Sequence, residues 1–176
     1  RSELDVVTPL LFSNGGTTYA GDRKSTVGID GVMPDYAYIS GPKLRYGRYL
    51  NDMDLAQRRK VCVIQKKTYK DLFPEGGDPC GRYIRIDSVY YQVVGVDYTN
   101  AEGISFGSEP GTTVLLPITL MQQTYNRGSQ VDMLAFTGRK GVVMSSLAPR
   151  IRETIARAHS IDPTDEQGVM LFNTEV

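Results

Sequence analysis

The sequence predicts an α+β protein with two lobes, and three observations support this prediction. Short strand-like segments alternate with short helical segments along the 176 residues. The block from Gly47 to Val96 contains a strand, a helix, a Gly/Pro turn and two further strands. Pieces with a β-α-β pattern flank this block on both sides. We therefore expect one lobe built from both ends of the chain and a second, smaller lobe inserted between them.

The first forty or so residues predict a long hairpin. Val6–Phe12 is apolar and strand-like, and Thr17–Ala20 resumes extended character. The residues between them, Asn14–Gly16, accept positive φ, so we expect the turn there. Lys24–Val32 alternates loosely between apolar and polar residues, which predicts the next strand.

The inserted block begins with a predicted helix cap or turn at Asn51–Asp54. Val61–Ile64 is a continuous apolar run, which is typical of a strand covered on both faces. We expect Thr68 to cap a short helix that ends at Leu72-Phe73, before Pro74.

Two strands follow, Tyr83–Ile86 and Tyr90–Val96, across a turn at Asp87-Ser88. One sheet face of this β-α-β-β unit can be buried under one helix. The segment Thr99–Thr113 is rich in Gly, Ser, Asn and Glu, so it is expected to be a long loop.

The rest of the chain predicts three strands and two helices. In order, they are a strand at Val114–Pro117, a helix at Thr119–Tyr125, a strand at Met133–Thr137, a helix at Val143–Ala158 and a strand at Val169–Phe172.

Composition excludes several classes of function. The chain has 20 basic and 20 acidic side chains and no net charge, which removes the electrostatic argument for nucleic-acid binding. No apolar run approaches the ~20 residues of a membrane-spanning helix. Because the sequence starts at Arg1 without an initiator Met or a signal-peptide pattern, we expect a segment of a longer protein.

Two cysteines, Cys62 and Cys80, allow two readings. Both are small enough to be buried free thiols, and a disulfide between them would close a loop of about 17 residues. The free thiols are favoured, because spacing alone does not establish the approach that a disulfide needs. With a single His and no CxxC, no metal site is expected.

One string matches a catalytic motif. Gly103–Gly107 fits the G-x-S-x-G nucleophile elbow, with Ser105 as the nucleophile, and Asp132 and His159 follow in hydrolase order. The elbow requires a strand before the serine and a helix after it, whereas this string lies in the predicted loop. His159 ends a predicted helix, where it can bond the last carbonyls. We therefore expect no catalytic residue, no cofactor and no metal ligand, and keep a Ser105 hydrolase as a remote alternative.

Tyrosine is abundant, with 11 Tyr against 5 Phe and no Trp. Tyr36, Tyr38, Tyr46 and Tyr49 crowd one region. Amphipathic rings of this kind favour interfaces, but strands also enrich tyrosine, so each ring can simply pack on a sheet.

Six short segments, in their order along the chain, resemble the periplasmic core domain of MacB-type ABC transporter permeases, a group that includes FtsX and LolC relatives. They are GRYLNDMD at Gly47–Asp54, VCVI at Val61–Ile64, the helix end Leu72-Phe73, the turn Asp78–Gly81, VVGV at Val93–Val96 and Leu116-Pro117. Cys62 and Cys80 depart from the family, which commonly has aliphatic residues at these positions.

The resemblance implies a porter-like lobe from residues 1–47 and 113–176 and an inserted sabre-like lobe from residues 48–112. It implies a domain that is not an enzyme, held at the periplasmic face of the inner membrane by flanking transmembrane helices. In the family, a separate cytoplasmic ATPase part hydrolyses ATP. The outer domain relays the conformational change to cargo or to a periplasmic adaptor, in a transporter expected to be a homodimer.

Within the family, the alternative is a lipoprotein-sorting permease domain that docks a soluble carrier through a protruding loop. The crossings between the two lobes are expected at Gly47 and in the loop Thr99–Thr113. Locking these crossings with an engineered disulfide is expected to abolish transport without preventing folding.

Overall fold

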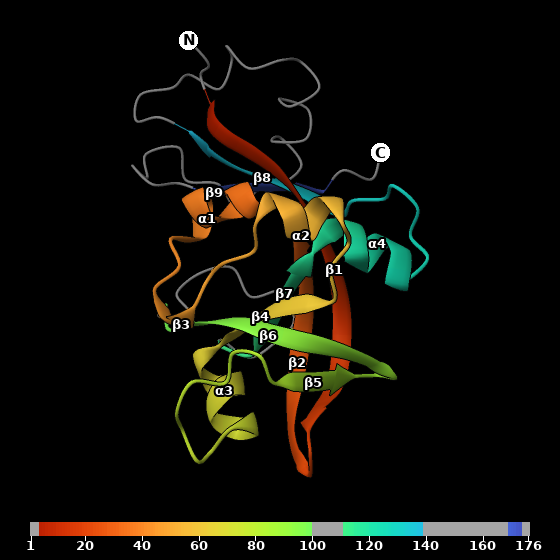
Figure 1. Cartoon of the computed structure of the whole chain (residues 1–176). Coiled ribbons are helices and arrows are strands. Elements are labelled where there is room, and N and C mark those ends of the chain that lie inside the picture. The colour runs from red at the N-terminus through yellow and green to blue at the C-terminus, as the bar shows by residue number, and fades with distance from the viewer. Residues whose placement is uncertain (1–3, 100–110, 139–168, 174–176) are drawn as a thin grey trace.

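The structure, a computed structural model, describes residues 4–99, 111–138 and 169–173 (Figure 1). The first half of the chain contains β1 (Leu4–Ala20), β2 (Arg23–Val32), a 3₁₀ turn η1 (Pro34–Tyr36), α1 (Ala37–Ser40), β3 (Leu44–Gly47), α2 (Asp52–Ala56), β4 (Val61–Gln65) and α3 (Lys66–Leu72). The second half contains β5 (Tyr83–Ile86), β6 (Val89–Asp97), β7 (Thr113–Pro117), α4 (Ile118–Thr124), β8 (Met133–Gly138) and β9 (Val169–Asn173).

All described strands belong to one sheet with the order β2-β7-β4-β6-β5-β1-β8-β9, and β3 pairs with β6. Because β1 also pairs with β2, the strands β1, β2, β7, β4, β6 and β5 form a closed ring. The α+β prediction is confirmed. Strands from the predicted inserted lobe pair with strands from the other range, β4 with β7 and β5 with β1, so the two-lobe division stays a prediction.

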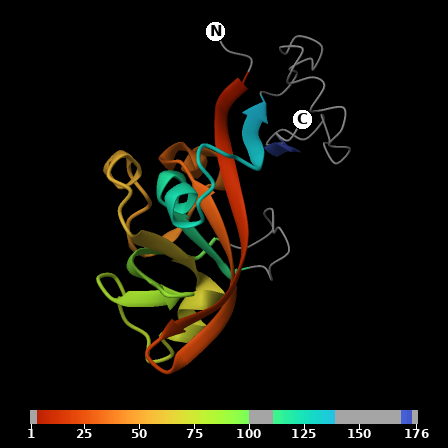
Figure 2. The same ribbon diagram turned by 90° about the vertical axis from the view of Figure 1, so that its right-hand side faces the viewer.

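The main core fills the inside of the ring. Alternate residues of the strands point inward, among them Val27, Ile64, Val93 and Val114, and all four are at most 2% exposed. Figure 2 shows α4 and α3 toward opposite ends of this ring. Tyr69 and Leu72 of α3, and Leu120 and Met121 of α4, join the same core.

A second core covers the outer face of the ring. Val32, Val63 and Leu115, from neighbouring strands, pack there beside Leu50. The strand Val61–Ile64 is buried on both faces as the sequence predicts, because the two cores lie on its opposite sides.

The first strand, β1, is longer than predicted. Its early residues pair with β8, from Leu4↔Gly138 to Leu10↔Met133. Its later residues pair with β2 and β5, including Thr18↔Ile86. One strand is therefore shared by the ring and by the ladder that it forms with β8 and β9.

The predicted hairpin turn at Asn14–Gly16 is wrong. The strand continues through these residues, and only an irregularity in the pairing with β2 occurs between Ser13 and Gly16. Gly16 has φ of 125°, so its positive φ serves a bulge. The turn lies at Gly21-Asp22, between the pair Ala20↔Arg23, and Gly21 has the φ of 61° that a two-residue turn favours.

Thr68 is not a helix cap. The helix α3 begins at Lys66 with Gln65 before it, and Thr68 is buried at 0% exposure on its inner side. The whole side chain is buried there, and burial decided its place over the capping capacity of its hydroxyl.

The other predicted elements in the described ranges lie within a few residues of their predicted positions. They are the cap at Asn51, the strands β2, β4, β5, β6, β7, β8 and β9, and the helix α4. The helix predicted at Val143–Ala158 and most of the loop Thr99–Thr113 lie outside the described residues.

Candidate functional site

The clearest built feature lies where β3 meets β6, at the predicted crossing at Gly47. Gly47 pairs with Gly95, and its φ is 69°. A Cβ on Gly47 would lie against the carbonyl of Val94 and within 2.5 Å of the Cys80 Sγ. The Arg48 amide donates to the Val94 carbonyl at 2.9 Å. The two strands can approach this closely only because neither glycine has a side chain.

Arg48 then turns its side chain onto a buried carboxylate. Its two terminal nitrogens donate to the two oxygens of Asp54 at 2.7 and 3.2 Å. The Asp54 side chain has 0% exposure, and Arg59 also approaches it, at 3.5 Å. A buried carboxylate needs such partners, and the bidentate guanidinium supplies both charge and geometry.

Asp54 also caps the helix that carries it. The Asn51 side chain accepts from the Asp54 amide, and the Asp54 carboxylate accepts from the Asn51 amide, both at 2.9 Å. Burial alone would raise the pKa of Asp54, but the hydrogen bonds from Arg48 and Asn51 and the charge of Arg48 together lower it. The residues of GRYLNDMD that matter most thus hold β3, α2 and β6 in one fixed arrangement.

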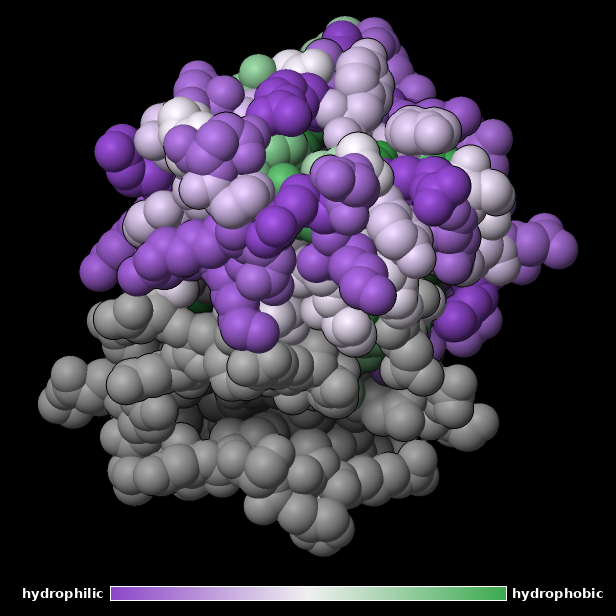
Figure 3. Space-filling model, turned by 90° about the horizontal axis from the view of Figure 1, so that it is seen from below, coloured by the Kyte–Doolittle hydropathy of each residue, from purple (hydrophilic) through white to green (hydrophobic). Residues whose placement is uncertain are grey.

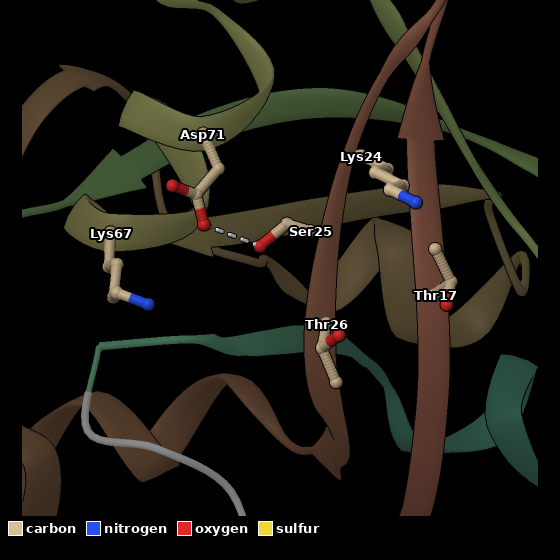
Figure 4. Close-up of a pocket in the computed structure, with 6 residues that line it drawn as sticks. All are labelled: Thr17, Lys24, Ser25, Thr26, Lys67 and Asp71. Carbon is tan, nitrogen blue, oxygen red and sulfur yellow. Dashed lines mark hydrogen bonds between the residues drawn. The ribbon is translucent and has the colours of Figure 1, made fainter.

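A pocket of about 390 Å³ lies between β2 and α3 (Figure 4), toward the lower end of the molecule in Figure 1. Its lining residues are Thr17, Lys24, Ser25, Thr26, Lys67 and Asp71. The Ser25 hydroxyl donates to the Asp71 carboxylate at 2.8 Å. The described surface seen from this end is mostly hydrophilic (Figure 3).

The place of this pocket follows from strand pairing. The pairing of β2 with β7 starts at Gly28, so among the described strands Arg23–Val27 pairs with β1 alone. Because Lys24 and Thr26 lie on one face of β2 and Ser25 on the other, the pocket wraps around this edge. It offers ammonium groups, hydroxyls and one carboxylate. None of its described lining residues is a histidine, the base most often found beside a catalytic serine.

One carboxylate, Asp30, lies on the same face of β2 as Val32, beside the outer core. Its pairing partners are Phe12 and Leu115, and burial raises its pKa to about 7. Burial also raises the pKa of Tyr36 and Tyr49, and the charge of Asp30 adds to both increases. The signal in the sequence was a carboxylate inside the apolar strand Val27–Val32, but its neighbours could not be read from one sequence.

The two cysteines are free thiols. Cys62 is buried in the ring, and burial raises its pKa. Burial, then the hydrogen bond with Asp78, raises the pKa of Cys80 to about 12. Neither thiol therefore resembles an activated nucleophile.

The residues of the hydrolase alternative are not brought together by the described part of the chain, because Ser105 and His159 lie outside it. Asp132 is described, and its carboxylate accepts from the Phe12 amide at 2.8 Å and lies 3.8 Å from Arg127. These contacts hold β1 next to the segment that leads into β8. The described residues contain no cluster of three or more His, Cys, Asp or Glu side chains that could hold a metal ion.

The crowded tyrosines have different environments. Tyr46 packs against Tyr69 with ring centroids 5.8 Å apart, whereas Tyr36 and Tyr49 pack against the outer core. Tyr38 is 78% exposed. Packing against the two cores thus explains three of the four rings. None of the helices in the described ranges has the length and hydropathy of a transmembrane span.

Comparison with known proteins gives consistent matches. The family model for the MacB-like periplasmic core domain matches residues 2–154. The chain is 26% identical over 156 residues to the macrolide export ATP-binding/permease protein MacB of Psychrobacter arcticus, which covers 89% of this chain and 23% of that protein. It is 28% identical over 153 residues to MacB of Pectobacterium atrosepticum, covering 87% and 23%. The chain thus spans less than a quarter of the length of these two relatives.

Solved structures show the same fold. The periplasmic region of MacB from Actinobacillus actinomycetemcomitans superposes with a TM-score of 0.66 at 18% identity, covering 98% of this chain and 73% of that one. The extracellular domain of the noncanonic ABC-type transporter YknZ from Gram-positive bacteria gives a TM-score of 0.65 at 15% identity, covering 98% and 83%.

Proposed function

The chain belongs to the family of MacB-like periplasmic core domains, and we propose on this basis that it works as a mechanical relay. In this proposal, the domain is part of an ABC transporter permease and does no chemistry itself. It passes ATP-driven movement of the membrane part to cargo or to a periplasmic adaptor. The domain would move relative to the adaptor or cargo. Its parts in this proposal are the porter-like range, residues 1–47 with 113–176, and the sabre-like range, residues 48–112.

The observation that supports this proposal is the double membership of β1. Its first residues pair with β8, and β8 pairs with β9, so the first and last described strands share one ladder. Its later residues are part of the closed ring. A displacement of the ladder therefore reaches the ring through one continuous hydrogen-bonded strand.

The ring is suited to move as a unit. Its strands are joined side by side without a gap, and residues such as Ile29, Ile84 and Leu116 fill its interior at 0% exposure. Close-packed interiors have low compressibility and transmit strain. The Gly47–Gly95 contact and the Arg48–Asp54 pair tie β3 and α2 to the same body.

The partners in this proposal follow from the family. Flanking transmembrane helices would hold the domain at the outer face of the inner membrane. A cytoplasmic ATPase domain or subunit would supply the movement, and a second copy of the permease would complete a homodimer. A periplasmic adaptor or carrier would receive the movement.

The relay can be tested in the full transporter by distance measurements between spin labels. Ser88, exposed at the β5–β6 turn, is replaced by Cys and labelled in both copies, with Cys62 and Cys80 replaced by Ala. We expect the distance between labels to change when ATP and vanadate trap the ATPase. Two glycines inserted between Asn14 and Gly15, at the irregularity of β1, should remove this change and leave ATP hydrolysis in place.

The matched control is the same insertion between Gly128 and Ser129. Both residues are exposed in the segment between α4 and β8, which is the other described covalent path between ring and ladder. This control should keep the nucleotide-dependent change. An unchanged label distance in the transporter without insertions would overturn the proposal.

A further inference from the structure

Four side chains form a row across the outside of the ring. Lys24 of β2 lies opposite Tyr19 of β1, Tyr19 lies opposite Arg85 of β5, and Arg85 lies opposite Tyr90 of β6. Side chains alternate along strands, and the neighbours Ala20, Ile84 and Tyr91 point into the core. The row therefore faces outward on four consecutive strands.

This row belongs to an open surface, which we name the Tyr-Arg face. It consists of Tyr19, Lys24, Tyr83, Arg85, Tyr90 and Gln92. Tyr83 and Tyr90 are 58% and 59% exposed, which is unusual for large rings on a sheet. In Figure 1, β5 and β6 lie in front of the other elements, with no described helix over them.

Arg85 is held in place before any partner arrives. Its guanidinium carbon lies 4.7 Å from the centroid of the Tyr19 ring. This cation–π contact limits the freedom of the side chain, so less conformational entropy is lost when it binds a partner. Tyrosine and arginine are also the residue types that dominate the energetics of protein interfaces.

The charge of the face has one sign. Lys24 and Arg85 are its ionised side chains, and none of its six members is a carboxylate. The nearest acidic residues along the strands are Asp22 and Asp87, which lie in turns at the ends of the strands. Asp87 accepts a hydrogen bond from Tyr125 at 3.4 Å, on the side of α4.

The positive character continues past the edge of β2. Lys24 also lines the pocket described above, together with Lys67 and Asp71 of α3. The face and the pocket are therefore one continuous surface, with aromatic rings at one end and two lysines and one carboxylate at the other.

We propose that the Tyr-Arg face is the docking surface for an acidic segment of a partner protein. Arg85 and Lys24 bind carboxylates of that segment, and Tyr83 and Tyr90 pack on its apolar atoms. This inference rests on the proposed relay function, because it names the surface through which movement leaves the domain.

The test is photo-crosslinking in the full transporter, in the envelope of its own cell. Benzoylphenylalanine replaces Tyr83 or Tyr90 in separate variants, and mass spectrometry maps the adduct. We expect both positions to link to the same protein, at a segment rich in Asp and Glu. Benzoylphenylalanine at Tyr38, which is 78% exposed on α1, is the control and should not give this adduct.

Charge reversal makes the test specific. The substitution Arg85→Glu, combined with Lys24→Glu, removes both proposed charge-assisted contacts and should lower the yield of the adduct at least about fivefold. Replacing the mapped acidic residues of the partner by Lys should restore the yield. Rescue by the partner's substitution shows that the variant is folded.

Each other outcome overturns the proposal. These outcomes are no adduct at either position, adducts with lipid or glycan alone, an adduct to a basic segment, and a yield that charge reversal leaves unchanged. The label-distance experiment separates this failure from that of the relay. If nucleotides still change the Ser88 label distance while no adduct forms, the docking surface is wrong and the relay stands.

Discussion

Gly47 and Gly95 lie opposite one another where β3 pairs with β6, and neither position has room for a Cβ. A Cβ on Gly95 would meet the carbonyl of Arg48, and a Cβ on Gly47 would meet that of Val94. The contact joins a segment before α2 to the end of the inserted block. The chain at Gly47, where a crossing between the two lobes is expected, is therefore tightly packed on its β6 side.

The substitution Gly47→Ala should destabilise the domain by about 3 kcal/mol. The left-handed φ of 69° costs an alanine ~1–2 kcal/mol, and the clash adds ~1–3 kcal/mol. Urea unfolding of the purified domain measures the change in midpoint. The control is Gly41→Ala. Gly41 has φ of 57° and open space around it, so this variant should lose only the stability that the left-handed φ costs. Equal losses in both variants would contradict this account.

The substitution Arg48→Met should destabilise the domain more than Arg59→Met. Arg48 makes two hydrogen bonds to the buried Asp54, whereas Arg59 approaches it at 3.5 Å. Because the Arg48 side chain is 43% exposed, solvent screens part of the effect, and we expect a loss of about 1–2 kcal/mol. Arg59→Met should cost about 0.5 kcal/mol or less. Thermal and urea unfolding of the two variants side by side decide the order.

The contribution of the Asp54 carboxylate to the stability of the folded domain should disappear in acid. Its pKa in the folded protein is lowered from 3.8, so its stabilisation is fully present above that value and is lost as the pH falls through the folded pKa. Asp54→Asn should therefore be less stable than the unmodified domain at pH 7, and the difference should shrink below pH ~4. A difference that stays constant between pH 7 and pH 3 would show that the charge of Asp54 has no part in it.

Asp30 should give stability the opposite dependence on pH. Its pKa is raised from 3.8 to about 7 by burial, so the folded protein holds this proton more tightly than the unfolded chain. Stability from this group is fully present below 3.8 and is lost as the pH rises to about 7. Asp30→Asn should raise the free energy of unfolding at pH 8 by on the order of 2 kcal/mol, with little effect at pH 4. Unfolding curves at the two pH values check both halves.

The two thiols should differ in accessibility. Cys62 is 0% exposed in the ring, so a maleimide reagent should reach it only when the domain unfolds. Cys80 is partly exposed, but its raised pKa keeps it protonated and slow near pH 7. Mass spectrometry should show at most one slow adduct in buffer and two adducts in urea. Rapid labelling of Cys62 in buffer would mean that the ring opens readily.

Local patterns in the sequence were enough for most elements. The continuous apolar run of β4 and the alternation in β5 and β6 identify strands without any neighbour. The positions of turns were harder to predict from glycine content, because Asn14–Gly16 has the composition of a turn but forms a bulge. The prediction that Thr68 caps a helix was wrong for a similar reason, because burial of the side chain outweighed its local hydrogen-bonding preference.

Closure of the ring could not be predicted, because it depends on pairs far apart in the chain. The Thr18 hydroxyl donates to the Arg85 carbonyl across 67 positions of sequence. The Tyr-Arg face has the same origin, since its row joins residues from four strands. The motif at Gly47–Asp54 was identified from the sequence. Its role in joining β3, α2 and β6, through a close glycine contact and an ion pair, became visible only in the structure.

The direction of β1 has a consequence for resistance to force. Hydrogen bonds in antiparallel ladders run perpendicular to the strands, so a pull along β1 loads its bonds to β2, β5 and β8 simultaneously. A pull across the strand would instead break them one at a time, like a zipper. A force applied to β1 from the β8–β9 end acts along the strand, so the domain should resist it with little extension.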